Sequence, residues 1–382
     1  MSNTEKIKAL RKELHRHPEL SGQESSTAQR IINFAQQYQP TTIISSIGGH
    51  GLAIVYEFSN KGPCIMLRCE LDALPIEEAN AFEHRSVVKG VSHKCGHDGH
   101  MAIVAGLMGW IEEQAFTKGK IVLLFQPAEE TGQGAPAVLN DPSFAGIKPD
   151  YLFALHNLPG EPVHQIIIVE NRFSATVQSL AIHLQGKQSH ASEPEKGINP
   201  ALAMAFITKR FAELINDDVK DESFALLTPV YSRMGAPAYG ISAGEGELHY
   251  TIRTWSEEKM QLLKEKLLMI VVEVCATHSL QFHINWFDFF PSAVNDARCN
   301  QIVREAAVAN GLSIKEQPLP FKFGEDFGWY TTEYNSALFG IGAGIHHPAL
   351  HHADYDFPDA IIETGIKMFG SIIEQVLNET SH

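Results

Sequence analysis

The chain has 382 residues, of which 44% are hydrophobic, and its formal net charge is −15 at pH 7. This length favours two domains or one large one, and the apolar fraction excludes global disorder. The acidic balance argues against nucleic acid or an anionic membrane as the main partner. The start of the chain is charged throughout, so we expect no signal peptide, and no apolar run approaches the ~20 residues that span a bilayer. We therefore expect a cytoplasmic protein.

The first part of the chain alternates apolar strands with helices. Helices are predicted at residues 4–17 and 99–114. A further helix, which Ser26 or Thr27 could cap, is predicted to run to about residue 38. Strands are predicted at "GLAIVYEF", "GPCIMLRCELDALP", "KIVLLFQ" and "YLFALH". This alternation favours an α/β fold whose sheet is largely parallel and covered on both faces.

The pattern changes near residue 174. "SLAIHLQGK", "GELHYTIRTW" and "SLQFHINWF" alternate polar and apolar residues, as half-exposed strands do, and helical stretches lie at about 199–216 and 256–277. The tail returns to α/β character, with the strand "SALFGIG" and a helix at about 358–377. We therefore predict an α/β domain of residues 1–173 and 289–382, interrupted by a smaller α+β domain of residues 174–288.

The five cysteines are odd in number and irregularly spaced, which argues against a disulfide framework. Cys64, Cys69 and Cys275 lie in apolar patterns and are expected to be buried hydrophobic residues. Cys95 alone has polar neighbours, in "SHKCGHDGHMA". This segment could form half of a metal site, or it could carry a redox-active thiol. It could also be only the loop before a helix, with Asp98 capping that helix.

Polar clusters follow four of the predicted strands, in "CELDALP", "QPAEE", "HNLPG" and "HHPALHHADYD". Because ligands of an open α/β sheet bind beyond the carboxyl ends of its strands, these clusters and "KCGHDGH" could meet at one edge. Thiolate, imidazole and carboxylate groups are ligands of zinc and similar divalent ions. Of the adjacent carboxylates Glu129 and Glu130, one could bind metal while the other moves protons.

Each cluster taken singly also has a structural explanation. Glu129 and Glu130 could form a solvated acidic turn, His156 could be a hydrogen-bonded core histidine, and "HHPALHHADYD" could be a polar surface loop. Only the joint placement after predicted strands favours a metal site.

The ordered set of motifs is more specific than any one of them. It comprises "LHRHPELSGQE", "LRCELDALPIEE", "HKCGHDGHMA", "LFQPAEE", "ALHNLPG", "SHASEPEKGINPA", "IRTW", "GEDFGWY" and "LHHADYDFPD". With these segments the chain resembles the di-metal amidohydrolase family of aminoacylase-like enzymes, hippurate hydrolases, N-acetyl-diaminopimelate deacetylases and auxin-conjugate hydrolases. The resemblance covers nearly the whole chain and implies a metal-binding α/β domain interrupted by a lid domain.

The resemblance also implies roles for individual residues. The implied metal ligands, with Cys95 able to bridge two ions, are Cys95, His97, Glu130, His156 and His351. Glu129 would be the general base and acid, and Asp72 would orient a ligand. His190 in the lid would help to hold the oxyanion, and Arg253 could clamp a substrate carboxylate or form an ordinary ion pair.

Two segments depart from the family pattern. Glu70 stands where aspartate is common, and "GAPAYGISAGEGEL" has Gly240 in place of an asparagine and Ala243 and Gly244 in place of Pro and Asp. The second change removes an amide near the expected substrate position, so it bears on substrate class and efficiency.

We expect a metal-dependent hydrolase that cleaves an amide bond in small N-acyl amino acids, with one or two ions of zinc, manganese, nickel or cobalt. One alternative is a di- or carboxypeptidase acting on free peptides. Another is a metal-binding homologue without catalysis, which the altered loop at Gly240 would favour. A homodimer could form through an exposed strand edge of the lid.

Overall fold

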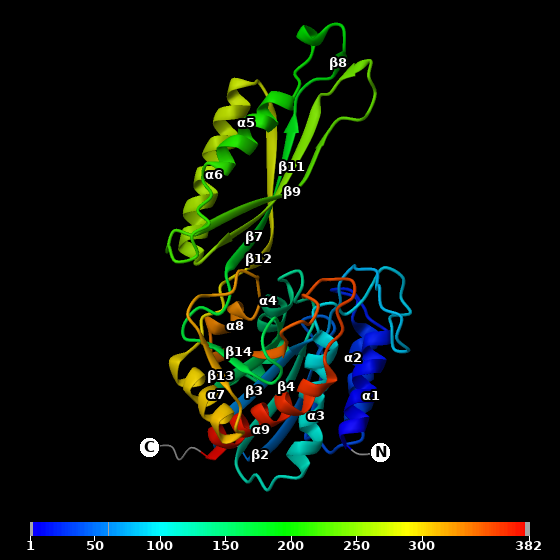
Figure 1. Ribbon diagram of the computed structural model, residues 1–382, viewed down its shortest axis with the longest axis vertical. Helices are drawn as coiled ribbons and strands as arrows, with labels where there is room; N and C mark the ends of the chain where they lie inside the picture. The colour runs from blue at the N-terminus through cyan, green and yellow to red at the C-terminus, as the bar shows by residue number, and fades with distance from the viewer. Residues whose placement is uncertain (1–2, 60, 379–382) are drawn as a thin grey trace. The chain divides into compact units, whose positions relative to one another are not determined.

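The computed structural model describes residues 3–59 and 61–378, which form two compact units (Figure 1). The larger unit contains the described residues up to Phe173, Ala293–Pro318, and the described residues from Glu325 onward. The smaller unit contains Ser174–Ser292 and the short segment Leu319–Gly324. No helix in residues 3–59 and 61–378 is long and apolar enough to cross a membrane.

The larger unit is built on one eight-stranded sheet with the strand order β1-β2-β4-β3-β5-β14-β6-β13. The strands are β1 Thr42–Ile47, β2 Gly51–Ser59, β3 Cys64–Glu70, β4 Gly119–Gln126, β5 Tyr151–Pro159, β6 Ile166–Val169, β13 Ile314–Gln317 and β14 Asn335–Gly344. Strands β4, β3, β5 and β14 run parallel to one another. The pairs β1–β2, β2–β4 and β6–β14 are antiparallel. The predicted α/β class is confirmed, and the carboxyl ends of the four parallel strands share one edge.

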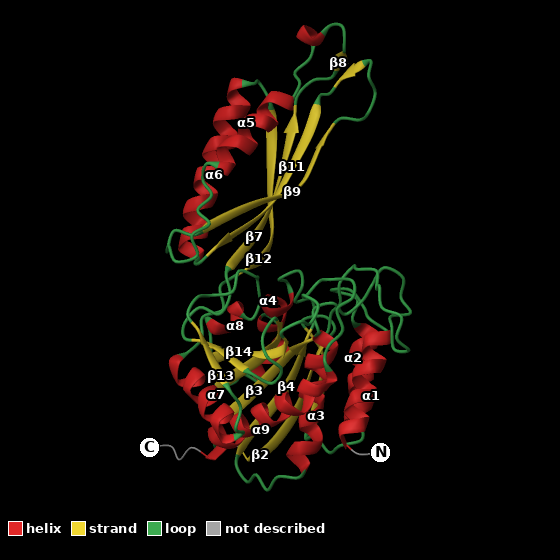
Figure 2. Cartoon of the chain, viewed as in Figure 1, coloured by secondary structure: helices red, strands yellow, loops and turns green. Residues whose placement is uncertain are grey.

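Helices cover this sheet (Figure 2). They are α1 Asn3–Arg16, α2 Ser25–Ala35, α3 His97–Glu112, α4 Gly134–Leu139, α7 Ala297–Ala309, α8 Gly328–Thr331 and α9 Ile362–Asn378. Helix α1 packs against α3 through its apolar face, which carries Ile7, Leu10 and Leu14, and α3 packs against α9. Helix α3 is buried over nearly its whole length, so it fixes the position of the segment that begins it.

The predicted cap of α2 is wrong. The helix begins at Ser25 rather than after Ser26 or Thr27. The carboxylate of Glu19 accepts hydrogen bonds from the backbone N–H groups of Ser26 and Thr27, at 3.3 and 2.6 Å. A side chain from the preceding loop therefore satisfies amides that the sequence suggested would be capped locally.

The smaller unit has a four-stranded antiparallel sheet with the order β12-β7-β11-β9. Its strands are β7 Thr176–Gln185, β9 Ala225–Met234, β11 Glu245–Thr254 and β12 Gln281–Phe290. Helices α5 Ala201–Ala212 and α6 Glu257–Thr277 lie on one face (Figure 2), over Leu180, Ile182 and Leu184 of β7. A two-stranded ribbon pairs β8 Ser189–His190 with β10 Ile241–Ser242.

Candidate metal centre

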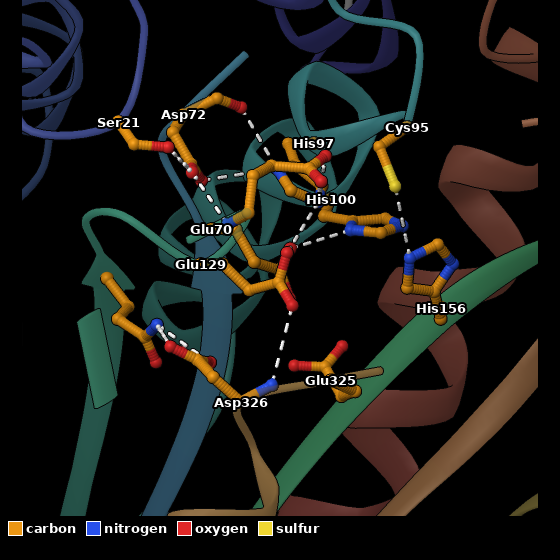
Figure 3. Close-up of polar contacts among 12 residues, drawn as sticks. Ser21, Glu70, Asp72, Cys95, His97, His100, Glu129, His156, Glu325 and Asp326 are labelled. Carbon is orange, nitrogen blue, oxygen red and sulfur yellow. Dashed lines mark hydrogen bonds and ion pairs between the residues drawn. The ribbon is translucent and has the colours of Figure 1, made fainter. Parts of the chain in front are cut away.

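Polar side chains gather at the carboxyl edge of the parallel strands in the larger unit (Figure 3). Asp72 lies two residues beyond β3, and Glu129 and Glu130 follow β4. His156 lies within β5, and His351 lies in the loop that follows β14. The topology therefore brings side chains from four sequence-distant segments to one edge, because parallel strands end on the same side of a sheet.

His97 is the first residue of α3, and its two ring nitrogens have different surroundings. Its Nδ1 lies 2.9 Å from the carbonyl oxygen of Asp72, which places the ring proton there. Its Nε2 is buried, makes no hydrogen bond to the described chain, and lies 3.8 Å from Glu129 and 3.9 Å from Glu130. A histidine that donates from one nitrogen and aims the other at carboxylates is oriented as a metal ligand.

The same segment aims Cys95 at β5. The Sγ atom of Cys95 lies 3.5 Å from Nε2 of His156, and Nδ1 of His156 donates to the carbonyl oxygen of Asn157 at 2.9 Å. Gly96 lies between Cys95 and His97 with a φ of 96°, and a Cβ there would stand 2.5 Å from Oδ1 of Asn157. Glycine is therefore required for the tight turn that points both neighbours at one place.

The five predicted ligands form two overlapping groups. The ligand atoms of Cys95, His97 and His156 lie within 4.8 Å of one another, and so do those of Cys95, Glu130 and His351. Ligand atoms bound to a tetrahedral zinc ion are separated by roughly 3.3–3.6 Å, close to the 3.5 Å between Cys95 and His156. Cys95 belongs to both groups, so the geometry is suited to a thiolate shared by two ions.

Backbone strain accompanies two of these positions. His351 has a φ of 65° and Ala128, which precedes the Glu129–Glu130 pair, has a φ of 51°. A side chain in this left-handed region costs about 1–2 kcal/mol, so such residues persist where the surrounding structure holds them. The backbone N–H of His351 donates to the carbonyl oxygen of Lys94 at 2.8 Å, which ties this loop to the segment carrying Cys95.

Asp72 is fully buried and connects two of the predicted ligands. Its Oδ2 accepts hydrogen bonds from the backbone N–H of Glu130 at 2.9 Å and from the hydroxyl of Ser21 at 2.7 Å. Its Oδ1 lies 3.4 Å from Nδ1 of His97. The pKa of Asp72 is lowered, because the contacts with His97 and the backbone outweigh the effect of burial.

Glu129 lies beside this group and is almost completely buried. Its Oε1 accepts from the backbone N–H of Asp326 at 3.4 Å, a long contact that leaves the carboxylate loosely held (Figure 3). Burial, followed by repulsion from Glu325 and Glu130, raises its pKa well above the ordinary value. Burial also raises the pKa of Glu130, to about 7, although His97 opposes this. A bound cation would reduce the repulsion among these carboxylates and so lower their pKa values.

The family model described as Peptidase family M20/M25/M40 matches residues 66–375, which is most of the chain. The chain belongs to this family. The resemblance predicted from the ordered motifs is therefore confirmed.

Relatives in the M20 family cover most of the chain as well. An N-acetyl-L-cysteine deacetylase of Bacillus subtilis (strain 168) is 32% identical over 349 residues, which is 89% of this chain and 82% of the relative. An N-acetyldiaminopimelate deacetylase of the same organism is 30% identical over 366 residues, 95% and 96% of the two chains. The crystal structure of a dinuclear metal binding peptidase of the M20 family from Bacillus subtilis, 26% identical, covers 99% of both chains with a TM-score of 0.82.

The donor set fits the divalent ions expected of an M20 enzyme. Nε2 of His97 and Oε1 of Glu130 are buried and have no hydrogen-bond partner in the described chain, as expected of atoms reserved for a metal. Burial, followed by the nearby carboxylates, raises the pKa of the Cys95 thiol well above its usual range. A coordinated cation would overcome this effect, since thiol ligands bind metals in the deprotonated form.

A buried charge cluster beside this centre was not predicted from the sequence. Arg68 in β3 is fully buried, and its guanidinium forms ion pairs with Glu70, with Asp326 at 2.5 Å and with Glu325 at 3.1 Å. Glu70 also accepts a hydrogen bond from Nδ1 of His100 at 2.7 Å. The signal was an arginine inside the apolar run "CIMLRCE", because a charge in a buried parallel strand requires partners.

A second buried network joins α1 to the segment that carries the ligands. His15 has Nδ1 at 2.9 Å from Asp98 and Nε2 at 3.0 Å from Glu78. Burial lowers the pKa of His15, but Asp98 and Glu78 raise it to about 9. Arg11 lies within 3.4 Å of Asp98, and Lys94 donates to Glu78 at 2.5 Å. Asp98 is therefore part of this network and does not serve as the local helix cap considered from the sequence.

His190 and Arg253 belong to the smaller unit. His190 is exposed, and its Nδ1 accepts a hydrogen bond from the backbone N–H of Ser192 at 3.1 Å. The carbonyl oxygen of Gly240 accepts from Ala191 at 3.0 Å, so the altered loop lies beside His190. A Cβ at Gly240 would meet no atom within 4 Å, so the absence of a side chain there is not a packing requirement. Arg253 donates to the carbonyl oxygen of Lys322 at 2.7 Å.

Proposed function

We propose that the protein is a metal-dependent amidohydrolase that cleaves the amide bond of small N-acyl amino acids. The observation that carries this proposal is the pair of ligand groups that share Cys95, with the buried Glu129 beside them. Two relatives named as deacetylases of N-acetylated amino-acid compounds support the substrate class.

Cys95, His97, Glu130, His156 and His351 would hold one or two divalent ions of zinc, manganese, nickel or cobalt. A bound ion would lower the pKa of a coordinated water toward 7 and would polarise the substrate carbonyl. Asp72 keeps the ring of His97 oriented and ties it to the backbone of Glu130.

Glu129 is the proposed general base and acid. Its carboxylate takes a proton from the attacking water and returns it to the leaving nitrogen. The loose contact with Asp326 favours this role, because a carboxylate held by several strong hydrogen bonds would be a poor proton carrier. Burial and repulsion from Glu325 and Glu130 raise the pKa of Glu129. A cation held by the ligands would counter this repulsion, so the carboxylate would remain able to accept a proton.

The smaller unit is proposed to act as a lid and as the site of a homodimer contact. We propose that His190 donates to the oxyanion and that Arg253 binds a substrate carboxylate, as the sequence resemblance implies. The exposure of His190 leaves its ring accessible. Burial lowers the pKa of Arg253. The cytoplasm remains the predicted location.

A peptidase activity is the second candidate, because the 26%-identical structure is described as a dinuclear metal binding peptidase. The same metal centre serves both reactions, so substrate preference distinguishes them. The competing predictions are turnover of N-acyl amino acids and turnover of dipeptides with a free amino group.

The decisive experiment is hydrolysis of N-acyl amino acids and dipeptides by metal-stripped protein, with zinc, manganese, cobalt or nickel added back singly. We expect turnover only with metal and preference for N-acyl substrates. Glu129→Gln should retain its metals and lose ~10²–10⁴-fold in kcat, whereas the exposed Glu113→Gln should behave as the wild type. Near-normal activity of the metal-loaded Glu129→Gln variant would exclude the proposed base. Metal binding without turnover of any substrate would favour a non-catalytic homologue.

A further inference from the structure

One face of the four-stranded sheet in the smaller unit carries imidazoles that the proposed reaction does not use. Leu180, Ile182 and Leu184 of β7 point to the helices, so the alternate residues of that strand point to the opposite, open face. His183 on β7, His249 on β11 and His283 on β12 lie on this open face, in three adjacent strands.

The strand register places these side chains beside one another. His183 lies directly opposite Glu247 on β11 and opposite His283 on β12. His249 follows Glu247 by two residues on the same strand and therefore on the same face. The ring centroids of His183 and His249 are 6.0 Å apart, and those of His183 and His283 are 6.5 Å apart. Directly opposed and diagonal cross-strand side chains are within mutual reach.

Glu247 lies between two of these rings. One of its oxygens is 3.8 Å from Nδ1 of His183, and the other is 3.6 Å from Nε2 of His249. Both distances are too long for hydrogen bonds but are close to the roughly 3.3–3.6 Å that separates ligand atoms around a tetrahedral ion. Two imidazoles and one carboxylate also form a common three-ligand set for zinc.

A further observation points to a missing partner. Nε2 of His249 is buried and has no hydrogen-bond partner in the described chain. A nitrogen of this kind normally faces a partner, which a bound cation would supply. Arg233 pairs with Glu247 at 2.9 Å, but the arginine is half exposed, so this surface ion pair contributes little and is easily exchanged.

We propose that His183, Glu247 and His249 form a second metal site, separate from the cysteine-containing centre, that binds a divalent transition-metal ion of the zinc, nickel or copper type. These ions prefer imidazole ligands, whereas magnesium and calcium prefer oxygen donors. His283 lies beside the site, with Nε2 at 2.6 Å from Oδ1 of Asn285, and is a neighbour rather than a ligand.

The test is a zinc titration of the full-length protein after the cysteine-containing centre has been saturated with zinc. Equilibrium dialysis in metal-buffered solution, followed by elemental analysis, should show one additional zinc ion per chain. We expect half-saturation between about 1 and 100 µM, weaker than four-ligand structural zinc sites. The absence of an additional ion up to 100 µM free zinc would overturn the proposal.

Variants identify the ligands. The double variant His183→Gln/His249→Gln should weaken binding of the additional ion by more than ~10-fold, the lower end of what even a supporting group contributes to a metal site. His278→Gln is the matched control, because His278 lies in the same unit at the end of α6 and stacks on Phe206. Retention of the additional ion in the double variant, or its equal loss in the control, would overturn the assignment.

Anomalous scattering at the zinc edge gives an independent readout that does not depend on the variants. A peak among His183, Glu247 and His249 in zinc-soaked crystals is expected. Peaks confined to the Cys95 centre or to other surface histidines would contradict the proposed site.

Discussion

Two groups of histidines in this protein have similar spacing but different surroundings. In the larger unit the rings of His97, His100 and His156 have centroids 4.9–6.4 Å apart. On the open face of the smaller unit the rings of His249 and His283 have centroids 6.0 and 6.5 Å from that of His183. The first group is buried, and short hydrogen bonds to carboxylates and carbonyl groups fix its rings. The second group is partly exposed, and its contacts with Glu247 are long.

The two groups show that the spacing of imidazoles and the rigidity of their orientation are separate properties. Spacing alone decides whether two imidazoles can reach one ion, but burial decides how firmly their orientation is held. Removal of a partner in the buried region leaves a charge or a polar group without solvent, whereas water replaces a lost partner on the open face. Substitutions in the two regions should therefore differ in their effects.

Replacement of Cys95 by serine should have the largest effect. Cys95 belongs to both ligand groups, so its loss should weaken the binding of both ions and reduce activity by more than ~100-fold, beyond what loss of a supporting group costs. Metal content and amide hydrolysis should be measured on the same sample. Cys275→Ser, which alters a buried cysteine of the smaller unit, is the control and should keep its metals. Full metal content in Cys95→Ser would show that the thiolate is not a shared ligand.

Arg68→Met should lower the free energy of unfolding by about 3–5 kcal/mol, because Glu70, Glu325 and Asp326 would keep buried charges without their cation. The measurement is chemical denaturation of the metal-stripped protein. Arg304→Met is the matched control, because Arg304 pairs with Glu170 and Glu316 near the surface and should contribute less than about 1 kcal/mol. Equal effects of the two substitutions would contradict the role of burial.

The buried His15 predicts a pH dependence of stability. Asp98 and Glu78 raise its pKa to about 9 in the folded protein, above the unfolded value of 6.5, although burial opposes this. The stabilisation is therefore fully present below pH 6.5 and is lost as the pH rises through 9. Between pH 6.5 and 9.5 the wild type should lose about 3 kcal/mol more of its unfolding free energy than His15→Gln. His17→Gln, in the loop just after α1, should follow the wild type. Parallel curves for the wild type and His15→Gln would refute this assignment.

The smallest effect is expected on the open face. Without added zinc, His183→Gln/His249→Gln should change the free energy of unfolding by no more than about 0.5 kcal/mol, because both side chains are partly exposed and their contacts with Glu247 are long. Once the cysteine-containing centre is saturated, further zinc should stabilise the wild type by mass action but not the double variant. A large loss of stability in the zinc-free double variant would mean that the two groups of histidines do not differ as described.

Much of the larger unit could be predicted from the sequence. Strands β2, β3, β4, β5 and β14 were recognisable as largely apolar runs. The polar residues that follow β3, β4, β5 and β14 identified the edge at which the centre lies. Strand β13, "IKEQ", was not predicted, because it is short and polar and becomes a strand only by pairing with the buried β6. The cap of α2 was also missed, because Glu19 lies outside the local motif that predicts caps.

The class of fold, the family and the types of side chain available for chemistry follow from the sequence alone, because they depend on periodicity and on motifs in a given order. The three-dimensional structure was needed to show which nitrogen of His97 faces Glu130, that Asp98 pairs with His15, and that His183 lies opposite Glu247. Hydrogen-bond direction and strand register depend on partners distant in the chain, and a one-residue change of register would turn each strand's side chains to the opposite face.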